Sequence, residues 1–178
     1  MADSKKVIEI IQAISKKIEE EKDYLTKLDQ PIGDSDHGIN MARGFGEVEK
    51  KLPTLEGKDI GTILKTVGMT LVSTVGGASG PLYGSAYLKA GMAAAGKEEL
   101  SMDDFIGVMK AATEAVEQRG KAVLDEATML DAMIPSLKAM EEANAGGADA
   151  KAVLDAGVKA AWAGAEHTKE LIATKGRA

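Results

Sequence analysis

The chain has 178 residues, of which 44% are hydrophobic and 28% are charged, as is usual for a single globular domain with a sizeable core. Its formal net charge of −6 argues against binding to nucleic acid, which depends on Lys and Arg contacts to phosphates, but not against one nucleotide bound through a divalent cation. There is no Cys, no visible signal peptide and no apolar run that approaches the ~20 residues of a membrane span, so we expect a cytoplasmic protein without a membrane partner.

The first predicted element is an amphipathic helix over residues 3–22, and Pro31 helps to end it. Its apolar residues are spaced by four, three and four positions and therefore share one stripe: Val7, Ile11, Ile14 and Ile18.

Residues 29–37 follow and concentrate more candidate chemistry than any other stretch, with Asp29, Asp34, Asp36 and the adjacent His37. Carboxylates this close repel one another unless a cation lies among them, and Mg²⁺ typically takes one or two carboxylates together with substrate phosphates. Aspartates are also common in turns that bind no metal. Three of them beside a His at the start of a helix nevertheless favour a Mg²⁺ site that holds a nucleotide diphosphate.

Two familiar loops are excluded by the spacing. An EF-hand that starts at Asp34 would need a bidentate Glu at its twelfth position, where the chain has Phe45. A Walker A loop is excluded because the pattern GxxxxGK[ST] does not occur in the sequence.

A second helix is predicted from about His37 to Lys51, which places the aspartates at a helix N-terminus, where free N–H groups favour anions. Asn40 and Arg43 in its first turns can face the same site, although Arg43 is equally well explained as a surface residue.

A third helix over about 59–74 leads into VGGASGPLYGS. Gly76, Gly77 and Gly80 allow close approach of the backbone, and consecutive N–H groups in such a turn can cradle a phosphate, while Ser79 can cap the next helix.

The remaining helices are predicted over about 81–96, from Ser101 to Gly120, from about 128–131 onward and over about 149–165, with a short helix in the tail. No segment has the period of a β-strand, so we predict an all-α fold of seven or eight antiparallel helices in a single domain over 1–178. In such an up-and-down arrangement the loops 29–37, 76–80 and 120–128 follow the first, third and fifth helices and lie at one end, where they can form a single site.

Four blocks, in this order along the chain, resemble the nucleotide-binding L subunit of bacterial dihydroxyacetone kinase and the corresponding C-terminal half of ATP-dependent dihydroxyacetone kinases: GDSDHGINMARGF, TVGGASGPLYGS, RGKAVLDEATMLDAMIP and KGRA. The resemblance covers essentially the whole chain. It departs from the family at Ser35, where the family usually has Gly, and the family usually continues past KGRA with a segment that closes over the nucleotide.

The resemblance implies a barrel of eight antiparallel helices with ADP or ATP and two Mg²⁺ ions at one end. The implied metal ligands are Asp29, Asp34 and Asp36. The implied nucleotide contacts come from three loops and the tail: His37, Gly38, Ile39, Asn40, Ala78, Ser79, Gly120, Met129 and Arg177.

The resemblance also implies a route for the phosphoryl group. A phosphohistidine on a partner M subunit phosphorylates the bound ADP, and the ATP formed gives its γ-phosphoryl group to dihydroxyacetone, which is held on a partner K subunit. The chain then needs no catalytic nucleophile of its own, because phosphoryl transfer depends on positioning and charge neutralisation.

Three alternatives remain at this point: the nucleotide domain of another kinase of the superfamily, such as a fatty acid kinase; an ADP-loaded regulatory module that acts through a transcription regulator; and a phosphocarrier that uses His37.

Overall fold

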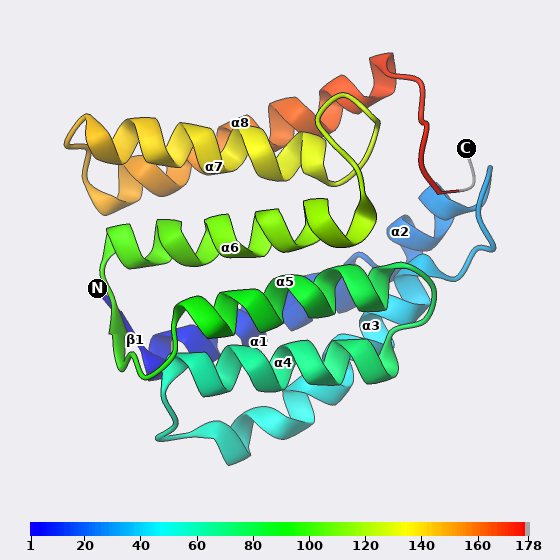
Figure 1. Cartoon of the computed structure of the whole chain (residues 1–178). Helices are drawn as coiled ribbons and strands as arrows, with labels where there is room; N and C mark the ends of the chain where they lie inside the picture. Colours follow the sequence, from blue (N-terminus) through cyan, green and yellow to red (C-terminus); the bar gives the residue numbers. More distant parts are fainter. Residues whose placement is uncertain (177–178) are drawn as a thin grey trace.

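The structure, a computed structural model, describes residues 1–176. It contains eight α-helices that run along one long direction of the molecule, with their connecting loops at its two ends (Figure 1). The helices are α1 Ser4–Glu20, α2 Lys22–Asp29, α3 His37–Lys51, α4 Ile60–Thr74, α5 Ser79–Ala93, α6 Met102–Gly120, α7 Leu130–Ala145 and α8 Ala150–His167. Two short 3₁₀ helices, η1 Leu52–Leu55 and η2 Thr168–Glu170, follow α3 and α8. The predicted all-α fold is confirmed.

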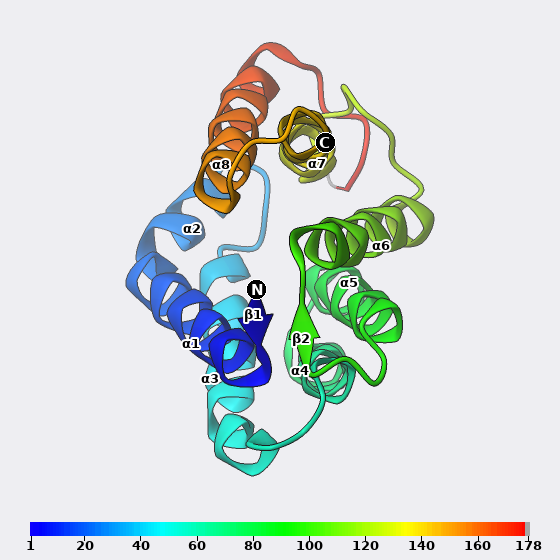
Figure 2. The ribbon, with the colours of Figure 1, turned by 90° about the vertical axis from the view of Figure 1, so that its left-hand side faces the viewer.

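Viewed along the helices, the chain forms a ring in which α3 to α8 follow one another in sequence order (Figure 2). The main core lies among α1, α3, α4, α5 and α6, and its fully buried side chains include Phe45, Leu52, Ile63 and Leu71. A second, smaller core of Ile106, Met140 and Val153 joins α6, α7 and α8. None of the helices within residues 1–176 has the combined length and apolar character needed to cross a membrane.

The described chain has only two strands, each of two residues, β1 Ala2–Asp3 and β2 Glu99–Leu100. They pair antiparallel, Ala2 with Leu100 and Asp3 with Glu99. This ladder closes the end of the ring opposite the three loops, and two residues are too few to leave an alternating pattern in the sequence.

The helix predicted over 3–22 corresponds to α1, but the sequence analysis missed α2, which follows it after a single residue. The break lies at Glu21, which ends α1, and α2 continues to Asp29. Because α2 runs on in the general direction of α1, the following loop still reaches the end of the ring that the helix count predicted (Figure 1).

Close backbone contact joins α4 to α5. A Cβ atom at Gly68 would lie 2.8 Å from the carbonyl oxygen of Gly84, and one at Gly61 would lie 2.7 Å from that of Gly91. The absence of side chains at these positions lets the two helices run side by side and fixes the position of the loop between them.

Candidate functional site

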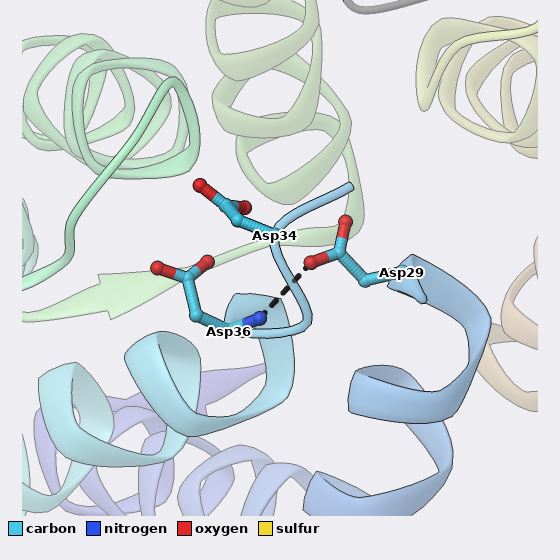
Figure 3. Close-up of side chains that lie close together, drawn as sticks. All are labelled: Asp29, Asp34 and Asp36. Atoms are coloured by element: carbon cyan, nitrogen blue, oxygen red, sulfur yellow. Dashed lines mark hydrogen bonds between the residues drawn. The ribbon is translucent and has the colours of Figure 1, made fainter. Parts of the chain in front are cut away.

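The three aspartates of the 29–37 stretch lie together on two helix ends and one turn (Figure 3). Asp29 is the last residue of α2, Asp34 lies in the turn and Asp36 precedes α3. One carboxylate oxygen of each lies within 4.8 Å of the others. A donor set made of carboxylates alone suits a hard divalent cation such as Mg²⁺ or Ca²⁺ rather than zinc or copper.

Backbone hydrogen bonds shape this turn around Asp29. Its Oδ2 accepts the N–H of Asp36 at 3.0 Å and that of His37 at 3.4 Å, and its carbonyl oxygen accepts the N–H of Gly33 at 2.6 Å. A Cβ atom on Gly33 would lie only 2.5 Å from the backbone carbonyl oxygen of Asp29, so the turn leaves no room for a side chain there. Ser35 completes the turn with a φ of +60°, in the left-handed region.

The glycine-rich loop after α4 forms the opposite wall of a cleft of about 300 Å³. Gly76, Gly77, Ala78 and Ser79 line this cleft together with the three aspartates, His37 and Asn40. The Ser79 hydroxyl lies 3.2 Å from His37 Nδ1, which joins the two walls directly. The cleft thus combines grouped carboxylates with a glycine-rich backbone segment that a ligand can approach closely.

Asn40 and Arg43 fasten the two walls to each other. The Arg43 guanidinium donates to Asn40 Oδ1 at 2.6 Å and to the carbonyl oxygen of Thr74, at the end of α4, at 3.2 Å. Asn40 is buried against Gly76, at which a Cβ atom would come within 3.2 Å of the amide nitrogen. Arg43 was predicted either to face the site or to lie on the surface; it is exposed and does not line the cleft, and its guanidinium braces the two walls.

A second pocket of about 550 Å³ adjoins the first, and Ala78 lines both. Its lining is largely apolar, with Pro81 and Leu82 from α5, Val116 from α6, and Met129 and Leu130 at the start of α7. Gly120, at the end of α6, also lines it. The loops after α2, α4 and α6 therefore meet at one end of the ring, as the helix count predicted.

The loop 121–129 that borders this pocket is held by Asp131. This buried carboxylate accepts the N–H of Asp125 at 2.5 Å and that of Thr128 at 2.7 Å. Lys121, Asp125 and Ala127 have positive φ angles, so the loop turns sharply three times. Its backbone is consequently fixed even though it contains no regular secondary structure.

The predicted nucleotide contacts are placed as follows. His37, Asn40, Ala78 and Ser79 line the first cleft, and Ala78, Gly120 and Met129 line the second pocket.

Two of the other three, Gly38 and Ile39, line neither pocket. Gly38 is buried where α3 passes α2, and a Cβ atom there would lie 2.0 Å from the carbonyl oxygen of Lys22. Ile39 is 50% exposed and stands apart from the described lining of both pockets. Arg177 lies outside the described residues.

Two basic side chains of the second pocket, Arg119 and Lys175, were not predicted. Arg119 lies next to the predicted Gly120, so the sequence could have indicated that it lies near the nucleotide site. Lys175 lies in the KGRA block, which was a usable signal, but the path of the tail that brings it to this pocket has no local pattern in the sequence.

Comparison with known proteins matches the sequence model of the DAK2 domain family to residues 31–178. Among curated proteins, the chain is 46% identical over 171 residues to the ADP-binding subunit of PEP-dependent dihydroxyacetone kinase 2 of Listeria innocua, covering 95% of this chain and 79% of that protein. It is 40% identical over 158 residues to the ADP-binding subunit of the PEP-dependent dihydroxyacetone kinase of Escherichia coli, covering 89% of this chain and 75% of that protein.

Among solved structures, the chain is similar to the dihydroxyacetone kinase from C. freundii in complex with AMP-PNP and Mg²⁺. The TM-score is 0.70 at 25% sequence identity, and the match covers 92% of this chain and 28% of that one. The helical architecture described above thus recurs in part of a larger protein.

Proposed function

The chain belongs to the DAK2 domain family, and on this premise we propose that it is the ADP-binding subunit of a phosphoenolpyruvate-dependent dihydroxyacetone kinase. Several relatives that carry this name match the chain over three quarters or more of their own length. The protein is then a kinase subunit rather than a complete kinase.

One observation of the molecule itself carries the proposal most strongly. Three grouped carboxylates face a glycine-rich loop across one cleft, and an apolar pocket continues from that cleft through Ala78. A nucleoside diphosphate matches both parts, because its charged phosphates bind divalent cations and the flat faces of its base pack on apolar side chains. This arrangement also favours the nucleotide role over a phosphocarrier, which needs no pocket for a base.

In this proposal Asp29, Asp34 and Asp36 hold two Mg²⁺ ions. The ions neutralise the phosphate charge that these carboxylates would otherwise repel. The 76–79 loop and His37 border the space for the phosphates. Pro81, Leu82 and Met129 offer the apolar surface on which an adenine ring packs.

The proposed partners follow from the type of kinase. A phosphohistidine on an M subunit phosphorylates the ADP held by this chain, and dihydroxyacetone on a K subunit accepts the γ-phosphoryl group. Phosphoryl transfer of this kind requires positioning and charge neutralisation more than a nucleophile from the binding subunit. The two pockets supply the positioning, and the aspartate cluster supplies the cation site.

Calorimetric titration with ADP tests the proposal. We expect Mg²⁺-dependent binding that EDTA removes, and Asp34→Asn should weaken it by roughly tenfold or more, because a charged ligand is replaced by a neutral one of the same size. Asp155→Asn is the matched control, since Asp155 is an exposed aspartate of α8 that pairs with Lys151. Equal ADP affinity in Asp34→Asn and wild type would show the metal assignment to be wrong.

A further inference from the structure

The segment 171–176, which follows η2, forms part of the wall of the second pocket. Lys175 and Gly176 line it, although the segment contains no helix or strand. A wall without its own ladder of backbone hydrogen bonds must be held in place by side chains. In Figures 1 and 2 the segment runs beside the loop 121–129.

Two side chains of the segment meet one residue of that loop, Glu126. The Thr174 hydroxyl donates to Glu126 Oε1 at 3.2 Å, and Lys175 Nζ lies 3.4 Å from the same oxygen. The other carboxylate oxygen, Oε2, accepts the N–H of Val123 at 2.9 Å, which orients the side chain. Glu126 is the more enclosed partner, with 21% of its side chain exposed against 39% for Lys175.

The support beneath Glu126 is rigid. Asp131 fixes the backbone on both sides of it through the N–H groups of Asp125 and Thr128. The hydrogen bond from Val123, followed by contacts with Lys175 and Thr174, lowers the pKa of Glu126, so its carboxylate is charged at neutral pH. A charged acceptor on a fixed loop therefore faces a segment that has little structure of its own.

We propose that Glu126 is a positioning residue that holds the segment 171–176 against the second pocket and thereby slows the release of bound nucleotide. The inference rests on the proposed function, because it takes the ligand of that pocket to be ADP. Removing the Glu126 contacts frees the wall of the pocket, which opens a path for ligand to leave. The cation site at the other end of the nucleotide is untouched.

Stopped-flow measurement of a fluorescent ADP analogue, displaced by excess ADP in the presence of Mg²⁺, tests the inference. Glu126→Ala should raise the dissociation rate by roughly three- to tenfold, the range expected for one exposed ion pair and one charge-assisted hydrogen bond. Glu126→Gln should lie between this variant and wild type, because the amide oxygen still accepts from Val123 and Thr174 but carries no charge. The association rate should stay unchanged in both variants.

Salt provides a readout that a merely structural role would not alter. Ions screen the pair of Glu126 with Lys175, so the wild-type dissociation rate should rise with NaCl more than that of Glu126→Gln. Glu142→Ala serves as the control, since Glu142 is an exposed glutamate that pairs with Lys138 near the far end of α7. It should match wild type in both rates.

The outcomes separate this inference from the proposed function. If wild type binds the analogue and Glu126→Ala releases it at the wild-type rate, the positioning role is wrong while the proposed function stands. If Glu126→Ala loses association rate and thermal stability together, its role is structural and the inference is overturned. If wild type itself binds no analogue, the proposed function is wrong and the inference is overturned with it.

Discussion

Ser35, which was expected to depart from the resembled family, lies in the turn between Asp34 and Asp36, and its backbone conformation is unusual for a residue with a side chain. Its φ of +60° lies in the left-handed region, where a side chain is disfavoured and Gly is not. The turn that presents Asp34 and Asp36 is therefore built with a small local strain.

Replacing Ser35 by Gly should relieve this strain. We expect Ser35→Gly to raise the free energy of unfolding by about 0.5–1 kcal/mol. The variant no longer bears the cost of a side chain in the left-handed region, and the greater freedom of Gly in the unfolded chain offsets part of this gain. Urea unfolding measures this change in the free energy of unfolding, and Ser85→Gly serves as the comparison variant. Ser85 lies inside α5, where Gly should lower stability by several tenths of a kcal/mol. A loss of stability in Ser35→Gly would contradict the account of the turn.

Single residues also show what local sequence can and cannot reveal about a site. Asp29, Asp34 and Asp36 are close in sequence, so their density alone predicted a common cluster, and their carboxylates do lie together. Arg43 was ambiguous, because its contacts to Asn40 and Thr74 depend on how α3 meets α4. Lys175 belongs to the KGRA block, but its place in the lining of the second pocket could not be predicted, since it depends on the path of the tail.

At the scale of elements, the pairing of α4 with α5 positions the glycine-rich loop. Gly68 faces the backbone of α5, and an added Cβ would lie 2.8 Å from both the carbonyl oxygen of Gly84 and the backbone nitrogen of Leu88. These neighbours are main-chain atoms, which cannot move aside as a flexible side chain can.

Gly68→Ala should therefore lower the free energy of unfolding by about 2–3 kcal/mol through overpacking. Gly107→Ala is the matched control, because Gly107 lies in α6 with open space around it and should gain up to about 1 kcal/mol from the higher helix propensity of Ala. Chemical denaturation of both variants decides the matter. Equal stability of the two would mean that α4 and α5 are not in close contact.

The junction of β2 with α6 makes a pH-dependent contribution to the free energy of unfolding. A hydrogen bond from Lys97, together with the Ser101 N–H and hydroxyl, lowers the pKa of Asp104 from 3.8 to about 2. Since the folded pKa is the lower one, this stabilisation is present above pH 3.8 and is lost as the pH falls toward 2. Asp104→Asn should be less stable than wild type near neutral pH, and the difference should shrink across that window in a series of urea titrations. A difference that is independent of pH would contradict the assignment.

The helix α2 was missed for a physical reason. It has no buried residue, and Tyr24 and Leu28 are each 57% exposed, so it leaves no stripe of core residues in the sequence. Its boundary at Glu21 is a local change of backbone angles, φ −93° and ψ 5°, rather than a loop. Helices with buried stripes, such as α3 and α4, were predicted within a few residues of their ends.

For the whole molecule, the direction of each helix determines at which end the residues of the candidate site lie. Three loops separated by about 45 residues in sequence meet at one end because an even number of reversals lies between them (Figure 1). This property follows from counting helices, so it could be predicted without a structure. The shape of the two pockets could not, because it depends on the tail and on the close contact of α4 with α5.

The central claim is that this end of the ring binds ADP through Mg²⁺ held by the three aspartates. Native mass spectrometry of the intact protein with added ADP and MgCl₂, before and after addition of EDTA, tests it most directly. The account predicts a mass increase equal to ADP plus bound Mg²⁺ that disappears on chelation. An unchanged protein mass with ADP and Mg²⁺ present, or bound ADP that survives chelation, would contradict it.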